Sequence, residues 1–174
     1  MQATETALIL PLVRGDLAAY KRLRDHMLAA WPEAFTSDAA AESARAAESY
    51  ASRLGDARND ASTFTLGAWC GASLVGAISC EHDARRKVRH IGHVVGMMVH
   101  DEARGQGLGR ALLQACIASA RGAGLELLTL SVTASNGHAI GLYARCGFER
   151  YGTLRRAIKI GQAFHDKDLM SLSL

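Results

Sequence analysis

The pattern of apolar and polar residues along the chain changes repeatedly between the period of a strand and that of a helix. Apolar runs bounded by turn residues predict strands at 6–13, 63–70, 73–81, 90–100, 126–132, 148–160 and 168–174. Helical spacing predicts helices after Asp16 to about Trp31, from Ser37-Asp38 to about Leu54, at 107–122, and from Ser135 or Asn136 to Arg145. Polar residues 55–62 form a predicted loop, and turns are expected at Gly71-Ala72 and 161–167.

This order of elements limits the fold. Antiparallel runs on both sides of a single β-α-β crossover predict an α/β fold with a mixed, mostly antiparallel sheet. We expect six to seven strands and four main helices, and neither a barrel nor a doubly wound sheet. The chain shows no internal repeat and no low-complexity linker, so residues 1–174 are predicted to form a single domain.

Composition excludes several classes of protein. Hydrophobic residues make up 49% of the 174 residues and charged residues 21%, as is typical of a globular protein. No apolar run is long enough for a membrane span, and residues 1–6 do not resemble a signal peptide, so we expect a cytoplasmic protein without membrane contact. A formal charge of +3 is too small to indicate a nucleic-acid partner.

The cysteines indicate neither a metal site nor a disulfide framework. All four (Cys70, Cys80, Cys116 and Cys146) are far apart, and no Cys-x-x-Cys pair occurs. We expect no metal cofactor, and we interpret these residues as small apolar side chains.

The strongest functional signal is a glycine-rich loop between strand 90–100 and helix 107–122, with the sequence Arg104-Gly105-Gln106-Gly107-Leu108-Gly109. Glycines at alternate positions let backbone N–H groups surround an anion, and the following helix N-terminus adds partial positive charge. A dinucleotide fingerprint beginning at Gly105 would need glycine at position 110, where Arg110 stands, and the chain contains no nucleotide triphosphatase loop. The loop is therefore a predicted phosphate cradle for another kind of ligand.

Read as Arg-x-x-Gly-x-Gly, with Arg104, Gly107 and Gly109, the loop resembles the acyl-CoA pyrophosphate loop of the GNAT superfamily (GCN5-related N-acetyltransferases). A second segment is similar to the family pattern Asn-x-x-Ala-x-x-Leu-Tyr-x-x-x-Gly-Phe, in register at Asn136, Ala139, Leu142, Tyr143, Gly147 and Phe148. Gly141 stands where the family often has arginine. The order of elements is also that of the GNAT fold, and the tail from Gly152 to Met170 resembles a bacterial branch that acetylates small amines.

The resemblance implies acetyl-CoA as co-substrate. Its pantetheine would pair with the backbone of strand 90–100 at Met97, Met98 and Val99, where a backbone N–H could stabilise the oxyanion. Its diphosphate would lie on the loop and the first turn of the helix, namely Arg104, Gly105, Gln106, Gly107, Leu108, Gly109 and Arg110. Asn136, Ala139 and Tyr143 would complete the site, although Asn136 could equally serve as a helix cap.

The resemblance also implies candidates for proton transfer. The matching family tyrosine points at the thioester sulfur, so Tyr143 is the candidate proton donor, unless it is a packed core residue. His93 stands where several family members have a glutamate base, and an imidazole suits proton removal near neutral pH. Glu81 on a neighbouring strand and a water chain are the alternatives, and His93 could instead be an ordinary hydrogen-bonded strand residue.

The sequence thus predicts an N-acetyltransferase that transfers acetyl directly to a primary amine of a small molecule or to an exposed amino group. A non-catalytic acyl-CoA-binding module, and an acyltransferase with another acyl group or an O-acceptor, are the alternatives. Acceptor contacts are expected from the region of Trp31, Phe35 and the second predicted helix, and from the Phe164-His165 turn, with packing as the alternative role of each aromatic side chain. Monomer and homodimer both remain open.

Overall fold

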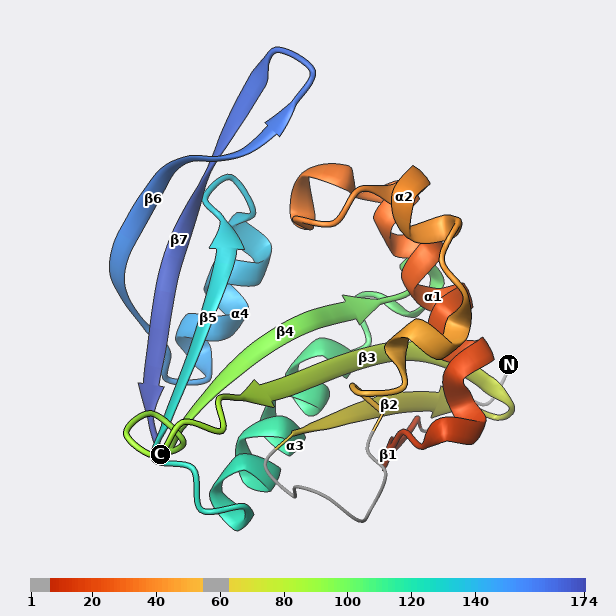
Figure 1. Ribbon diagram of the computed structural model, residues 1–174, viewed down its shortest axis with the longest axis horizontal. Coiled ribbons are helices and arrows are strands. Elements are labelled where there is room, and N and C mark those ends of the chain that lie inside the picture. Colours follow the sequence, from red (N-terminus) through yellow and green to blue (C-terminus); the bar gives the residue numbers. More distant parts are fainter. Residues whose placement is uncertain (1–6, 55–62) are drawn as a thin grey trace.

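A computed structural model describes residues 7–54 and 63–174 of the chain. Its strands form one seven-stranded sheet in the order β1-β2-β3-β4-β5-β7-β6 (Figure 1). The strands are β1 (Leu8–Pro11), β2 (Phe64–Cys70), β3 (Ser73–His82), β4 (Ile91–Val99), β5 (Leu127–Thr133), β6 (Glu149–Ile160) and β7 (Ala163–Ser173). The α-helices are α1 (Leu17–Ala30), α2 (Ala39–Ser43), α3 (Leu108–Gly122) and α4 (Gly137–Arg145). The predicted mixed sheet is confirmed, because β4 and β5, joined by α3, form its one parallel pair among the described strands.

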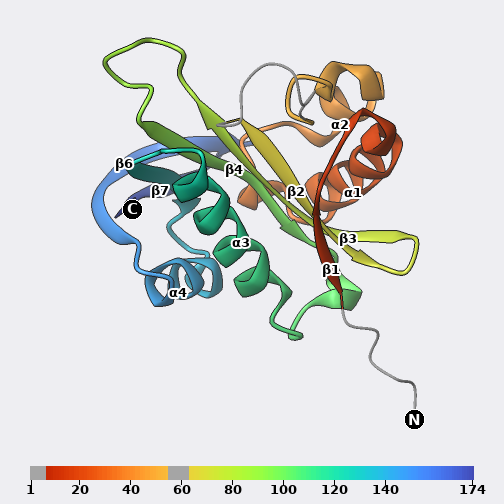
Figure 2. The same ribbon diagram turned by 90° about the horizontal axis from the view of Figure 1, so that it is seen from below.

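The helices cover the two faces of the sheet separately, with α1 and α2 on one face and α3 and α4 on the other (Figure 2). Alternate residues of each strand therefore enter two different cores. On the α1 face, Tyr20 of α1 is fully buried together with Ala77 and Met98 of the sheet. On the α3 face, Cys80 and Cys116 are fully buried, which confirms their expected packing role. Cys70 and Cys146 are half-buried free thiols.

The sheet opens between its two central strands. The described pairing of β4 with β5 covers only Ile91–His93 against Leu127–Thr129, whereas β5 stays paired with β7 as far as Thr133. Beyond His93 the two strands diverge (Figure 1). In the same part of β4 the register with β3 shifts between Ala77 and Ser79, and Gly96 has φ +59°. This bulge and the divergence leave backbone groups of β4 facing an opening in the sheet.

The predicted second helix to Leu54 is wrong. The helix α2 ends at Ser43, and a separate 3₁₀ helix, η3, spans Ala47–Tyr50. The break lets Tyr50 and Leu54 pack in the core beneath α1, where they are 3% and 0% exposed. Tertiary burial thus overrides the helix propensity of the alanine-rich sequence.

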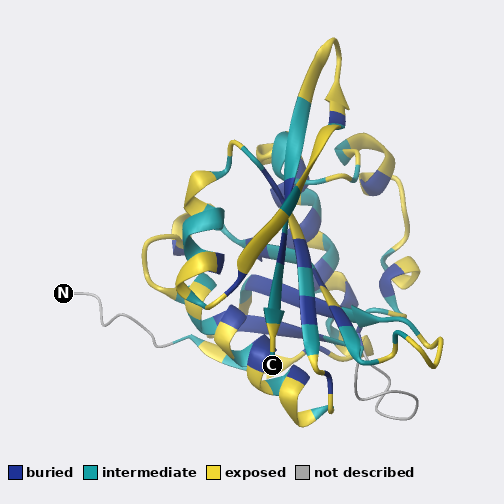
Figure 3. Cartoon of the chain, turned by 90° about the vertical axis from the view of Figure 1, so that its left-hand side faces the viewer, coloured by how far each residue is buried: buried dark blue, intermediate teal, exposed yellow. Residues whose placement is uncertain are grey.

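Three local predictions also need correction. Asp16 does not cap α1 through its side chain, because its carboxylate accepts instead from the N–H of Val13 (2.9 Å). The turn after β6 consists of Gly161 and Gln162 alone, since β7 begins at Ala163 and its hairpin extends from the rest of the molecule as an exposed arm (Figure 3). The first strand is shorter than the predicted 6–13; residue 6 and the predicted loop 55–62 lie outside the described residues.

Within the described ranges, no helix combines the length and the apolar character that a membrane crossing requires.

Candidate active site

The glycine-rich loop has an open backbone conformation. Gly105 and Gly107 adopt φ values of +76° and +78°, which side-chain-bearing residues rarely adopt, and a Cβ added at either would meet no atom within 4 Å. Gly107 is the N-cap of α3 and provides no side-chain cap. The first N–H groups of α3 therefore lack intrahelical partners and lie beside open space, as an anion-binding helix N-terminus requires.

Gly109 has a different role from the two loop glycines. A Cβ at this position would lie 3.3 Å from Leu142 and 3.4 Å from Met97, so the absence of a side chain allows α3, α4 and β4 to pack closely. Beside it, Leu108 is half-buried and Arg110 is exposed on the first turn of α3. The side chain of Arg110 is thus exposed to solvent next to the open loop.

Arg104 lies against the end of α1. Its guanidinium carbon is 4.2 Å from the centre of the Trp31 ring, and its Nε is 3.3 Å from the carboxylate of Asp101. The indole N–H of Trp31 donates to the same carboxylate (3.0 Å). Gln106 donates to the carbonyl of Glu102 (3.3 Å). These contacts join the loop to α1, so Arg104 would have to share its guanidinium between Trp31, Asp101 and a diphosphate.

Tyr143 of α4 lies beside β4. Its hydroxyl donates to the sulfur of Met97 (3.5 Å), and its ring packs edge-on against Phe148. Burial, reinforced by the nearby Cys116 thiol, raises the pKa of Tyr143 to about 12. The hydroxyl therefore keeps its proton at neutral pH and suits proton donation rather than proton removal.

The three predicted strand residues face two different sides of the sheet. Met97 and Val99 lie near Gly109 on the α3 face. The side chain of Met98 is 2% exposed in the α1 core, so only its backbone is available to a ligand. The alternation follows from the strand period of two.

Asn136 caps helix α4. Its side-chain oxygen accepts from the N–H of Ala139 (3.1 Å), which confirms the cap among the two roles considered. Ala139 is half-buried and packs against the α3-side core. In the next turn lies Gly141, the position at which the family often has arginine. A Cβ at Gly141 would lie 3.1 Å from the guanidinium of Arg145, so the side chain of Arg145 fills the space beside this glycine.

The two candidate bases are neighbours on the α1 face. Glu81 and His93 are directly opposite in the β3–β4 register, and strand alternation places them on the same face as Ala77 of the α1 core. His93 is exposed, and its Nδ1 lies 2.7 Å from the hydroxyl of Thr129 on β5. Glu81 forms an ion pair with Arg53 (2.8 Å). Thr129 thus fixes the imidazole ring at the point where β4 and β5 diverge, with Nε2 turned away from that bond.

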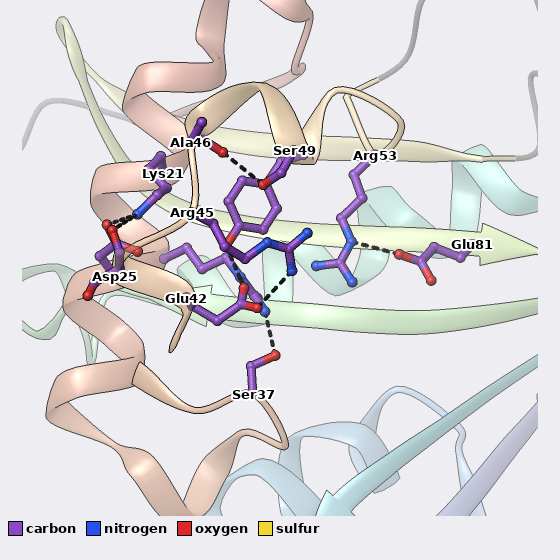
Figure 4. A network of polar contacts seen from close by, with 12 residues as sticks. Lys21, Asp25, Ser37, Glu42, Arg45, Ala46, Ser49, Arg53 and Glu81 are labelled. Atoms are coloured by element: carbon purple, nitrogen blue, oxygen red, sulfur yellow. Dashed lines mark hydrogen bonds and ion pairs between the residues drawn. The ribbon is translucent and has the colours of Figure 1, made fainter. Parts of the chain in front are cut away.

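A cavity of about 460 Å³ lies on this face beside Glu81. We call it the arginine pocket, because Arg24, Arg45 and Arg53 line it together with Glu42, Tyr50 and Glu81. Figure 4 shows Glu42 beside Arg45 on one side of the pocket and the Arg53–Glu81 ion pair on the other. Substrate contacts were expected near the second predicted helix, but no motif indicated these arginines, because the chain breaks between α2 and η3 where a continuous helix was predicted.

Lys167 is a second polar residue that the sequence did not indicate. Its ammonium donates to Thr36 (2.6 Å) and to Ser131 (3.4 Å), and burial lowers its pKa. Thr133 of β5 donates to the carbonyl of Glu33 in the 3₁₀ helix η2 (Pro32–Ala34; 2.6 Å). The segment after α1 is therefore anchored to β5 and β7. Lys167 was predicted to lie in a turn at 161–167, but it belongs to β7.

The aromatic residues expected to contact the acceptor mostly contact the protein. Phe35 packs against the α1 core, and Trp31 is held by Asp101 and Arg104. Phe164 lies in β7 rather than in a turn, with the guanidinium of Arg156 3.9 Å from its ring centre.

Comparison with known proteins gives a consistent result. The model of the acetyltransferase (GNAT) family matches residues 20–148. A relative from Pseudomonas aeruginosa, an L-methionine sulfoximine/L-methionine sulfone acetyltransferase, is 40% identical over 79 residues, which are 44% of this chain and 44% of that protein. The match therefore spans less than half of the length of this relative.

Solved structures resemble the chain over nearly its whole length. An acetyltransferase of the GNAT family from Streptococcus pneumoniae has a TM-score of 0.86 at 26% identity, covering 97% of this chain and 99% of that one. A putative acetyltransferase from Salmonella typhimurium, solved with its cofactor acetyl-CoA, has a TM-score of 0.83 at 20% identity, covering 97% and 94%. The predicted arrangement of sheet and helices is thus the one found in solved GNAT structures.

Proposed function

Because the chain belongs to the GNAT acetyltransferase family, we propose that it is an acetyl-CoA-dependent N-acetyltransferase that acts on a primary amine. One observation carries the proposal: a buried, protonated tyrosine and a histidine lie on opposite faces of the sheet at the opening between β4 and β5. An acyl donor and an amine could therefore approach the same opening from two sides. The small-molecule acceptor of the Pseudomonas relative supports a small amine as the substrate.

The residues present fit acetyl-CoA. The open loop at Gly105 and Gly107 with the N-terminus of α3 suits a diphosphate, and Arg110 lies next to it. Toward β5, the backbone of β4 from Met97 to Val99 has no described strand partner, although Met98 and Val99 pair with β3 on the other side. This edge suits the amides of pantetheine, with Asn136 and Ala139 on helix α4. When bound, the co-substrate supplies an acetyl group activated as a thioester.

Proton transfers follow from the positions of the two side chains. The amine nitrogen forms a bond to the acetyl carbon, and the carbon–sulfur bond breaks. Tyr143 gives the departing thiolate its hydroxyl proton, while His93 accepts the proton that the amine loses, either directly or through water. Glu81 is the alternative acceptor of that proton, but its ion pair with Arg53 makes it less available.

Two alternatives differ from this proposal in measurable ways. A non-catalytic acyl-CoA-binding module would bind acetyl-CoA but release no thiol with any amine. An acyltransferase for another acyl group or for a hydroxyl acceptor would release thiol only with that donor or acceptor. Assaying thiol release from acetyl-CoA with a panel of amines distinguishes the three. The cytoplasmic location, the single domain and the oligomeric state stay predictions.

Replacing Gly107 with valine is expected to weaken acetyl-CoA binding by at least about fivefold, because holding a β-branched residue at φ +78° in the binding conformation costs more than about 1 kcal/mol. Isothermal titration of both proteins with acetyl-CoA measures the loss. Gly122→Val is the matched control, because Gly122 lies at the other end of α3, also with open space around it. Equal affinities of wild type and Gly107→Val would contradict the assignment of the loop.

His93→Ala is expected to lower kcat by about 10- to 100-fold and to change the acidic limb of its pH profile. An imidazole base must be neutral to accept a proton, so a rate that depends on the imidazole falls where acid protonates it, and the variant without the imidazole should lack this dependence. Measuring kcat from about pH 5.5 to 8.5 with saturating substrates tests the role.

Thr129→Val serves as the matched variant for His93. It removes the hydroxyl that holds Nδ1 but keeps the imidazole, so it should lower kcat less and retain the acidic limb. If the His93→Ala profile keeps the shape of the wild-type profile, the base is Glu81 or water.

A further inference from the structure

The arginine pocket lies on the side of the sheet from which the acceptor would approach. Glu81 lines it and is directly opposite His93 in the β3–β4 register, whereas the glycine loop begins the helix on the other face (Figures 2 and 4). Residues opposite each other in an antiparallel pair have Cβ atoms about 5 Å apart. A small molecule with its amine at His93 could therefore place its other end in the pocket.

The three arginines of the pocket are not equivalent. Arg24 has a 5% exposed side chain, and it donates from Nε to Glu42 (3.1 Å) and from Nη2 to Ser37 (2.8 Å). It is therefore part of the wall. The side chains of Arg45 and Arg53 are 50% and 29% exposed, and each is paired with one glutamate.

Arg45 and Arg53 can bind a further partner. Each guanidinium has five N–H donors in one plane. The described carboxylate contacts use Nη1 of Arg45 (2.9 Å, to Glu42) and Nε of Arg53 (2.8 Å, to Glu81). The remaining donors of each fork match the paired oxygens of a carboxylate or a phosphate.

Charge favours an anion in the same place. Among the lining residues that the structure describes, three arginines stand against two glutamates, which leaves positive charge in excess. The carboxylate of Glu42 is already bound by Arg24, Arg45 and the Tyr50 hydroxyl, so it is not available to an ammonium group. A cavity of about 460 Å³ is of a size that holds a small molecule.

We propose that the acceptor is a small amine that also carries an anionic group, a carboxylate or a phosphate, which Arg45 and Arg53 bind while the amine lies at His93. The proposal rests on the function proposed above and adds the class of acceptor and two specificity residues. Because the acid and amine ends bind at different places, an acceptor without the anion would lose binding energy but could still react.

Matched acceptors test the proposal. An α-amino acid is compared with the amine formed by its decarboxylation, and a hexosamine 6-phosphate with the free hexosamine. For at least one pair, we expect kcat/KM to be about tenfold or more higher for the anionic member. The pair that shows the difference distinguishes carboxylate from phosphate. Equal or higher kcat/KM for the uncharged or cationic members of both pairs would overturn the proposal.

Arg45→Gln and Arg53→Gln should each lower, by about tenfold or more, the ratio of kcat/KM for the anionic acceptor to kcat/KM for its partner without the anion. The KM for acetyl-CoA should not change. Arg53→Lys keeps the charge but loses the fork, and an intermediate kcat/KM is expected. Arg121→Gln, an exposed arginine in the last turn of α3, is the control.

Titration of the same acceptors into the protein without acetyl-CoA separates the two proposals. If anionic amines bind in the wild type and lose affinity in Arg45→Gln and Arg53→Gln, but no acceptor is acetylated, the pocket is assigned correctly and the proposed activity is wrong. If acetylation occurs and both glutamine variants treat every acceptor as the wild type does, the activity stands and the pocket assignment is wrong. Circular dichroism shows whether each variant is folded.

Discussion

The Tyr143→Phe variant will have a kcat at least about 100-fold below that of the wild type, with acetyl-CoA affinity unchanged within about twofold. The substitution removes only the hydroxyl, which donates to the Met97 sulfur beside the opening in the sheet. The ring stays packed against Phe148, so the fold and the diphosphate loop are not disturbed. Single-turnover measurement of acetyl transfer and titration with acetyl-CoA give the two quantities separately.

A matched control and the pH profile sharpen this test. Tyr151→Phe removes a hydroxyl from a 60% exposed tyrosine of β6 and should leave both quantities unchanged. Because the pKa of Tyr143 is raised to about 12, its hydroxyl stays protonated well above neutral pH. At pH values below about 10, deprotonation of Tyr143 should therefore not reduce kcat. A Tyr143→Phe rate equal to that of the wild type would show that Tyr143 is a packing residue.

The parts of the site that could be predicted are those that depend on local sequence. The loop at Gly105 and Gly107 and the cap at Asn136 each follow from residues a few positions apart, because a turn or a helix end is a local structure. For the same reason the order of strands and helices, and with it the GNAT fold, followed from periodicity and motif.

The acceptor side could not be predicted in the same way. Glu42 meets Arg24 from 18 positions away, and Lys167 meets Thr36 from 131 positions away. Neither contact leaves a local pattern. The alanine-rich sequence after Asp38 even suggested a continuous helix, which would have removed the break on which the arginine pocket depends.

The residues that could be predicted and those that could not lie on opposite faces of the sheet. The α3 face carries the motif residues Gly107 and Tyr143, which we propose to serve the acetyl donor. The α1 face carries Arg45, Arg53 and Glu81, which the motifs do not include. A family with one donor and many acceptors would be expected to keep the first set and vary the second.

The wall of the arginine pocket depends on one buried carboxylate, and Glu42→Ala is expected to lower the free energy of unfolding by about 3 kcal/mol. Glu42 is 8% exposed and binds Arg24, Arg45 and Tyr50, so its removal leaves the guanidinium of Arg24 buried without its ion-pair partner. Urea unfolding at neutral pH measures the loss. Glu48→Ala, an exposed glutamate of η3, is the control and should change the free energy by less than about 0.5 kcal/mol.

The effect of Glu42 should also depend on pH. Burial alone would raise the pKa of Glu42, but hydrogen bonds from Tyr50, Arg45 and Arg24 outweigh it and lower the pKa to about 2. An unfolded glutamate titrates near about 4.3, so between these values the unfolded chain binds more protons and the stability of the wild type falls with falling pH. The difference in unfolding free energy between wild type and the isosteric Glu42→Gln should therefore be full above about pH 5 and should shrink as pH approaches about 2. A difference that stays constant over this range would show that the carboxylate charge of Glu42 does not stabilise the wall of the arginine pocket.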